Sequence, residues 1–83
     1  MIQVLYFAQL RELFNLQQEQ LELTAEIITL GDLRHMLSQR GTRWLALSEY
    51  KKTQAAVNQQ LADDDMVLQA GDEIAFFQPV TGG

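Results

Sequence analysis

The sequence contains no cysteine and only one histidine, and these two absences exclude several kinds of functional site. Without cysteine the chain has no disulfide, no thiol nucleophile and no thiolate to offer a metal ion. One imidazole does not build a metal cluster, and we interpret His35, inside the helical segment 33–37, as a surface or half-buried residue and not as a catalytic one. If this protein carries reactive sulfur, no cysteine side chain holds it.

Basic residues are also scarce, because six Lys and Arg stand against eleven Asp and Glu, a formal net charge of -5. Nucleic acid needs a basic face for its phosphates, so we expect no nucleic-acid partner. The acidic surface favours solubility, and a second interpretation is that it steers a basic partner. The three aspartates of 63–65 cannot all point at one ion and no spaced ligand pattern follows them, so we predict a solvated turn and no metal site.

Long apolar runs are missing too. None approaches the roughly 18 residues of a membrane span, and residues 1–7 lack the basic and apolar regions of a signal peptide. We therefore expect no membrane association and a cytoplasmic location. The 83 residues are enough for a single domain. A domain of this size has little room for a deep cleft of its own, which favours a carrier, a binding module or a subunit that completes another protein's site.

The apolar pattern predicts strands near both ends of the chain and one main helix between them. The expected elements are a strand over 2–8, a short helix over 9–15, a half-buried strand over 20–24, a short helix over 44–50, a polar turn over 51–53, a strand over 55–61 interrupted by the polar residues 58–60, and a last strand over 72–80. The first and last strands are apolar on both faces, so we expect them to be central, parallel neighbours in a mixed sheet.

The main helix is predicted to begin after Thr29. The Thr29 hydroxyl is placed to cap the helix while Asp32 reaches back, which is the pattern of a capping box. An apolar stripe follows at helical spacing as far as Leu37, and Gly41 is the expected stop. One helix after two strands and before two more predicts an α+β roll in which the helix packs on one face of the sheet.

The opposite face of that sheet is predicted to carry an apolar docking patch. If Ile74 and Phe76 face the helix, the residues that alternate with them face away from it, and a small acidic protein does not normally leave such side chains together in water. The predicted patch comprises Leu5, Phe7, Arg11, Ala75 and Phe77. Arg11 is placed to pair with a carboxylate at the rim, and a solvated role for it is an equal alternative. A further alternative is that the short helix or residues 42–52 cover Phe7 or Phe77.

Three segments carry a resemblance to a known family. Phe7-Ala8-Gln9-Leu10-Arg11-Glu12 resembles the Phe-Ala-x-x-Arg-Glu pattern of the small, sulfur-carrier subunits of molybdopterin synthase, and Ala56-Val57-Asn58 resembles their Val-Asn strand. The ending Gly71-Asp72-Glu73-Ile74-Ala75-Phe76-Phe77-Gln78-Pro79-Val80-Thr81-Gly82-Gly83 resembles their Gly-Asp-Glu-Val-Ala-Phe…Pro-Pro-Val-x-Gly-Gly ending. The resemblance spans the whole chain. Ala70 and Gln78 depart from the pattern, and neither touches the final glycines.

The resemblance implies the α+β, ubiquitin-like β-grasp fold for one domain over 1–83, with 79–83 as a flexible functional tail. It also implies a carrier that is not catalytic alone and binds no cofactor stably. In this family an E1-like adenylyltransferase uses ATP to convert the terminal carboxylate, here that of Gly83, to an acyl-adenylate. Sulfur then displaces AMP and leaves a thiocarboxylate. The large synthase subunit, in a heterotetramer of two small and two large subunits, binds the tail and transfers the sulfur to cyclic pyranopterin monophosphate.

The residue types of the tail suit this role. Gly82 and Gly83 have no Cβ atom, so a narrow channel that excludes side chains would accept them. Fully extended, five residues reach at most about 17 Å, and we expect the free tail to be disordered. The residues predicted to enter the partner are Pro79, Val80, Thr81, Gly82 and Gly83.

Three other functions stay open on the sequence. The chain could be another Gly-Gly sulfur carrier, such as the thiamine-pathway protein, although those are usually shorter and lack the segment 7–12. It could be a ubiquitin-like modifier that becomes conjugated to lysines. It could also be an interaction domain whose terminal residues form a frayed end without a role.

Overall fold

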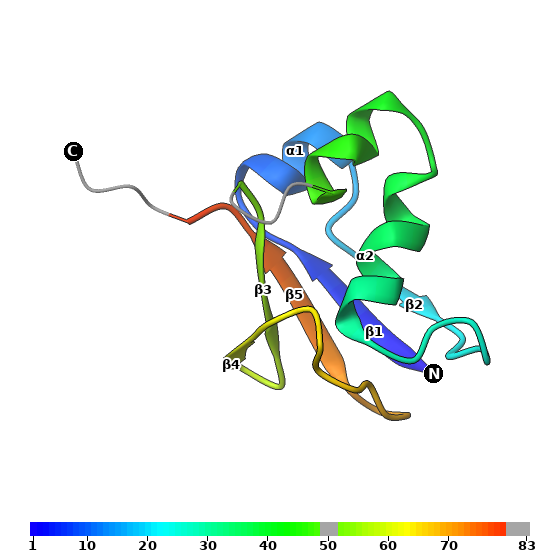
Figure 1. The fold of residues 1–83 in the computed structure, drawn as a ribbon. Coiled ribbons are helices and arrows are strands. Elements are labelled where there is room, and N and C mark those ends of the chain that lie inside the picture. Colours follow the sequence, from blue (N-terminus) through cyan, green and yellow to red (C-terminus); the bar gives the residue numbers. More distant parts are fainter. Residues whose placement is uncertain (49–51, 80–83) are drawn as a thin grey trace.

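The computed structural model describes residues 1–48 and 52–79, which form a sheet covered on one face by helices (Figure 1). In this part of the chain the elements follow in the order β1 (Ile2–Tyr6), α1 (Gln9–Phe14), β2 (Gln18–Leu21), α2 (Leu30–Ser38), the 3-10 helix η1 (Thr42–Ser48), β3 (Gln54–Val57), β4 (Gln60–Ala62) and β5 (Glu73–Phe77). No helix among the described residues is long and apolar enough to cross a membrane.

The sheet is mixed, with the strand order β2-β1-β5-β3-β4. β1 and β5 are parallel neighbours, while β2, β3 and β4 each join in antiparallel pairing. The predicted α+β fold and the predicted adjacency of the first and last strands are therefore confirmed. β5, the last strand of the described residues, lies in the middle of the sheet between β1 and β3.

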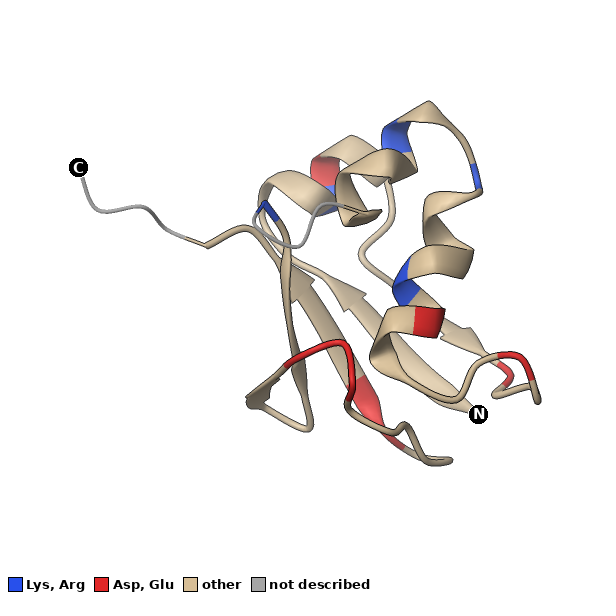
Figure 2. Ribbon diagram, in the orientation of Figure 1, with Lys and Arg blue, Asp and Glu red and all other residues tan. Residues whose placement is uncertain are grey.

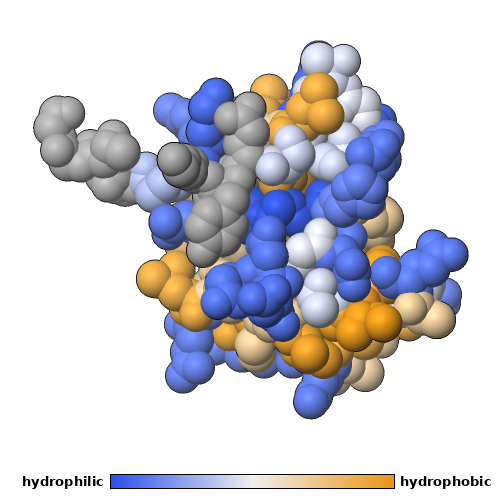
Figure 3. Space-filling model, in the orientation of Figure 1, coloured by the Kyte–Doolittle hydropathy of each residue, from blue (hydrophilic) through white to orange (hydrophobic). Residues whose placement is uncertain are grey.

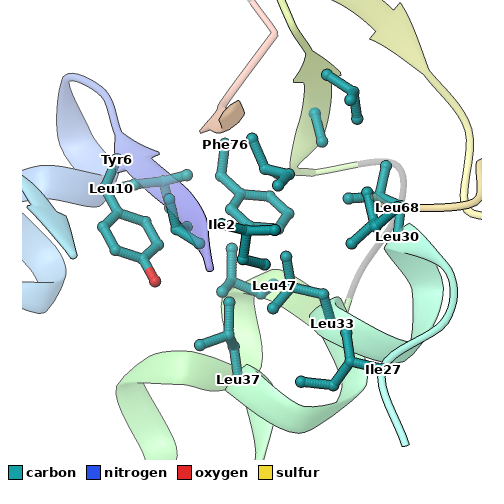
Figure 4. Packing of buried hydrophobic residues seen from close by; sticks show 14 of the residues in the cluster. Ile2, Tyr6, Leu10, Ile27, Leu30, Leu33, Leu37, Leu47, Leu68 and Phe76 are labelled. Atoms are coloured by element: carbon teal, nitrogen blue, oxygen red, sulfur yellow. The ribbon is translucent and has the colours of Figure 1, made fainter. Parts of the chain in front are cut away.

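One face of the sheet packs against α2 and forms the core. In β1 and β5 every second residue is buried, and Leu30, Leu33 and Leu37 of α2 are fully buried against them. Figure 4 shows Leu33 and Leu37 pointing toward Phe76. The alternate residues of β1 and β5 and the apolar stripe of α2 therefore form a single buried cluster. The remaining residues of β1 and β5 must then lie on the opposite face of the sheet.

The capping box of α2 is present as predicted. Thr29 Oγ1 accepts a hydrogen bond from the Asp32 N–H at 3.2 Å, and Asp32 Oδ2 accepts one from the Thr29 N–H at 3.0 Å. The helix ends at Ser38, three residues before Gly41. Its last turn tightens there, since the N–H groups of Gln39 and Arg40 donate to the carbonyls three residues back.

The strand predicted over 20–24 is displaced, because β2 spans Gln18–Leu21. Its limit is set by its neighbour: Leu21 pairs with Ile2, where β1 begins, so later residues find no partner in β1. The first strand is likewise shorter than predicted. It ends at Tyr6, and Ala8, with φ 51°, turns the chain into α1.

The prediction of one interrupted strand over 55–61 is wrong, because this segment forms most of the hairpin of β3 and β4. Asn58 and Gln59 have φ values of 52° and 71°, the backbone of a tight two-residue turn. The Asn58 side chain holds this turn against β5, since its Nδ2 donates to Asp72 Oδ1 at 2.9 Å and its Oδ1 accepts from the Glu73 N–H at 3.0 Å. The polar residues that seemed to interrupt one strand therefore join two.

Thr53, predicted to lie in a polar turn, is fully buried. Its hydroxyl donates to the Ala46 carbonyl at 2.8 Å and its own carbonyl accepts from Arg34 Nη1 at 2.8 Å. Because both polar groups have partners, burial of this residue costs little. Residues 49–51, which complete the predicted helix and turn, lie outside the described residues.

Candidate functional site

The face of the sheet turned away from α2 carries a row of apolar side chains. Leu5 of β1 pairs with Ala75 of β5, and Ala75 pairs with Ala56 of β3. Ala56 in turn pairs with Leu61 of β4. Register partners point to the same side of a sheet, so the row crosses four strands. Leu5, Ala75 and Ala56 are half-buried, and Leu61 is 73% exposed.

Two phenylalanines extend this row toward one end of the sheet. Phe77 follows Ala75 by two residues on β5 and is half-buried. Phe7 lies just beyond β1, is 47% exposed, and donates its N–H to the Phe76 carbonyl at 3.1 Å. Neither ring is buried by α1 or by the described part of 42–52. The structure therefore brings the apolar members of the predicted patch together, and its role in binding a partner stays a prediction.

Arg11 lies on α1, at the same end of the sheet as Phe7. The turn at Ala8 brings α1 back across this end, where it packs against β5 and η1. Arg11 is exposed, and its guanidinium makes no ion pair with any residue that the structure describes. An exposed guanidinium at this end of the sheet is suited to pairing with a carboxylate of another protein.

The tail begins beside this patch. β5 ends at Phe77, and Pro79, two residues later, is half-buried. Val80, Thr81, Gly82 and Gly83 lie outside the described residues, so their predicted insertion into a partner stays a prediction. A protein that binds Phe77 and its neighbours is necessarily close to the start of this segment.

Leu61 is a member of the outer face that was not predicted from the sequence. Its position depends on the hairpin turn at Asn58 and Gln59, which reverses the chain and places Leu61 opposite Ala56. The three consecutive polar residues 58–60 between short apolar runs are the available signal for such a turn.

Arg34 is a second residue whose position the sequence did not predict. Its side chain reaches from α2 to two backbone carbonyls, and Nη1 donates to that of Leu47 at 3.0 Å and to that of Thr53 at 2.8 Å. Its Nε lies 3.1 Å from Asp64 Oδ1. Asp64 is therefore paired, which corrects the prediction of a wholly solvated 63–65 turn. Among the described residues, no three His, Asp or Glu side chains are placed to hold a metal ion.

A polar cluster ties β2 to the end of α2. The Tyr6 hydroxyl donates to Glu19 Oε2 at 2.8 Å, and Arg40 donates to both Glu19 oxygens at 2.7 and 3.0 Å. The Arg40 guanidinium also lies 4.8 Å from the centre of the Trp44 ring. Burial, with a smaller contribution from Glu19, raises the pKa of Tyr6 well above its ordinary value. The cluster lies on the α2 side of the sheet, away from the row of Leu5, Ala75, Ala56 and Leu61.

Exposed apolar side chains also gather along the lower margin of the view in Figure 3. Ile28 is 56% exposed and Val67 is 55% exposed, and Met66 lies next to them. Backbone bonds from Leu30 N–H to the Met66 carbonyl and from Leu68 N–H to the Ile28 carbonyl join the two segments. This group belongs to the connections before α2 and β5 and is separate from the row on the sheet.

Comparisons with known proteins give consistent results. The model of the ThiS family matches residues 4–83. The molybdopterin synthase sulfur carrier subunit of Escherichia coli (strain K12) is 46% identical over 83 residues, which are 100% of both chains.

Two solved structures share the ubiquitin-like β-grasp fold predicted from the sequence. SAMP1 of Haloferax volcanii has a TM-score of 0.78 and 25% identity, covering 99% of this chain and 98% of that one. The complex of subunits 1 and 2 of molybdopterin-converting factor from Helicobacter pylori 26695 contains a chain with a TM-score of 0.67 and 25% identity, covering 99% and 97%.

Proposed function

The chain belongs to the ThiS family, and on that premise we propose that it is the sulfur carrier subunit of a molybdopterin synthase. The observation that carries this proposal is the 46% identity, over the whole of both chains, to a curated relative with that name. The sequence ends in the Gly-Gly pair on which such a carrier depends. In this proposal the carboxylate of Gly83 carries the sulfur, and no cysteine side chain takes part.

The proposed chemistry takes place on the carbonyl of Gly83. An E1-like adenylyltransferase supplies ATP, and attack of the carboxylate on its α-phosphorus releases pyrophosphate and gives an acyl-adenylate. Sulfur at the oxidation level of sulfide, delivered by another protein, then attacks the carbonyl. A C–S bond forms as the C–O bond to AMP breaks, which leaves a thiocarboxylate. The chain supplies no catalytic side chain for these steps, and we place them in the cytoplasm, where ATP is available and thiols stay reduced.

The apolar row on the outer face supports a docking role. In this proposal the patch of Leu5, Phe7, Ala75 and Phe77, extended by Leu61, binds the activating enzyme and the large synthase subunit in turn. Arg11 pairs with a carboxylate at its rim. Since the tail starts two residues beyond Phe77, binding of the body brings the terminus within reach of a partner's active site.

The large subunit then uses the sulfur on cyclic pyranopterin monophosphate. Two such transfers, from two loaded chains, make the dithiolene of molybdopterin, and the tail returns each time as the carboxylate. A complex of two small and two large subunits is the proposed assembly. The Helicobacter pylori relative, whose structure is a complex of subunits 1 and 2, supports the pairing of a small with a large subunit.

A second function, conjugation to other proteins, is favoured by one observation. The small archaeal modifier SAMP1 shares the fold at a TM-score of 0.78. Both functions use an adenylated terminal glycine, and they differ in whether sulfur or a lysine amine displaces AMP. A thiamine-pathway carrier would differ from the proposed molybdopterin synthase carrier only in the molecule that accepts the sulfur.

Complementation separates these functions. The chain is expressed in one bacterial strain that lacks its molybdopterin synthase small subunit and in another that lacks its thiamine sulfur carrier. We expect it to restore a molybdenum-dependent enzyme activity in the first strain and no thiamine-independent growth in the second. A variant that ends at Gly82 is the matched control and should restore neither. Rescue of the second strain alone, or lysine-linked adducts in place of rescue, would overturn the proposal.

A further inference from the structure

A groove of about 560 Å³ lies between β2 and α2, on the side of the sheet opposite the docking patch. Its floor is apolar and is formed by Leu21, Ile27 and Met36, which come from β2, from the following connection and from α2. Ile27 is buried, while Leu21 and Met36 are half-buried. The α2 helix therefore covers only part of the apolar surface at this margin of the sheet.

The strand beside the groove is an edge strand. In the described part of the chain β2 lies at the end of the sheet and pairs with β1 alone. In an antiparallel pair alternate residues direct their backbone N–H and C=O groups away from the partner strand, so the outer side of β2 has such groups available. Leu21 pairs with Ile2, whose side chain faces α2. A further strand added at this edge would place every second side chain in the groove.

The rim of the groove is acidic. Glu22 and Glu26 are exposed on the connection between β2 and α2, and Asp32 lies in the first turn of α2 (Figure 2). The backbone N–H groups of Thr29 and Ile28 lower the pKa of Asp32, which keeps its charge. No Lys or Arg is among the described residues that line the groove. Arg40, one residue beyond it, is paired with Glu19.

We propose that this groove and the free edge of β2 bind an extended segment of a partner protein in which apolar side chains alternate with Lys or Arg. The apolar side chains fill the groove over Leu21 and Met36, and the basic ones meet Glu22 and Glu26. A second copy of this chain does not fit, because pairing β2 with β2 would bring the two acidic rims together. Since the groove and the docking patch lie on opposite faces, both can be occupied at once.

The test is a titration of the full 83-residue chain, labelled with ¹⁵N, with a synthetic hexapeptide that alternates lysine and valine. We expect amide shift changes in 18–22 and on the flank of α2 from Asp32 to Gln39, and weaker binding at high salt. The matched peptide of glutamate and valine should cause none. Changes confined to the outer face or to 63–65, no changes up to millimolar peptide, or equal binding of both peptides would overturn the proposal.

A pair of charge reversals sharpens the test. Glu26→Lys changes the rim, while Asp65→Lys makes the same change of net charge at an exposed acid on another turn. We expect Glu26→Lys to weaken peptide binding about fivefold and Asp65→Lys to leave it nearly unchanged. Urea unfolding of both variants checks that the fold is kept. Equal losses of affinity would mean that net charge alone attracts the peptide, which would contradict a built site.

Discussion

Leu5 of β1 and Ala75 of β5 are register partners in parallel strands, and both point away from α2. The same row continues through Ala56 to Leu61, so the outer face is apolar across four strands. The row lies next to Phe77, where β5 ends, and Pro79 follows two residues later. The proposed docking surface and the start of the proposed tail are therefore neighbours in the fold.

Leu61 offers the cleanest test of this surface. It is 73% exposed, so Leu61→Asp should leave the free energy of unfolding nearly unchanged while it weakens binding to the large synthase subunit by about tenfold. Isothermal titration calorimetry measures the affinity. Gln60→Asp is the matched control, because Gln60 precedes Leu61 on β4 and its side chain points to the opposite side of the sheet. Undiminished affinity of the Leu61 variant would remove β4 from the interface.

Arg34 should be essential to the fold, although it touches no part of the proposed interface. Arg34→Met leaves the carbonyls of Leu47 and Thr53 without their donor and Asp64 without its partner. We expect a loss of about 3 kcal/mol in the free energy of unfolding. Urea denaturation followed by circular dichroism measures it. The exposed Arg43 provides the comparison, since Arg43→Met should cost under about 0.5 kcal/mol, and equal costs would contradict the account.

The hairpin turn predicts a stabilising change. Gln59 adopts a φ of 71°, which glycine adopts without the penalty of a Cβ atom. Gln59→Gly should therefore raise the free energy of unfolding by about 0.5–1 kcal/mol. Gln60→Gly, one residue later in β4, should lower the free energy of unfolding. Glycine gives the unfolded chain more conformational freedom, and the extended backbone of a strand does not need glycine. A lower urea midpoint for the Gln59 variant would show that the turn does not require this backbone.

Stability should depend on pH through Tyr6. Its pKa is raised above the ordinary 10.0, first by burial and then by the hydrogen bond to Glu19, so the folded state holds the phenolic proton more tightly than the unfolded state. This stabilisation is complete below the unfolded pKa and is lost as the pH rises above it. We expect the urea midpoint to fall between about pH 9 and pH 12 more steeply in the wild type than in Tyr6→Phe. Parallel slopes would contradict this.

The sequence predicts those features that depend on neighbours in the chain. Thr29 and Asp32 are three residues apart, which is enough to define a capping box, and alternation in β1 and β5 separates the core face from the outer face. These two local patterns, together with the order of elements, lead to the correct fold and to Leu5, Ala75 and Phe77 on one surface.

What the sequence does not predict depends on contacts between distant segments. Arg34 occupies a helical position that is compatible with a solvated flank, but it is buried and bonded to the distant residues Leu47, Thr53 and Asp64. Leu61 joins the outer face because Asn58 and Gln59 adopt left-handed backbone angles, without the glycine that usually marks such a turn. The groove beside β2 is lined by residues of β2, of the connection after it and of α2, and no local pattern predicts how these segments come together.

Mass spectrometry shows whether the carbonyl of Gly83 carries sulfur. The chain is incubated with its activating enzyme, ATP and a sulfur donor, and the mass of its C-terminal peptide is then measured. We expect a gain of about 16 Da, from sulfur in place of oxygen, located at Gly83. The gain should be absent when ATP is omitted and absent in a variant with one residue added after Gly83. An unmodified Gly83 under these conditions, or the same gain in the extended variant, would contradict it.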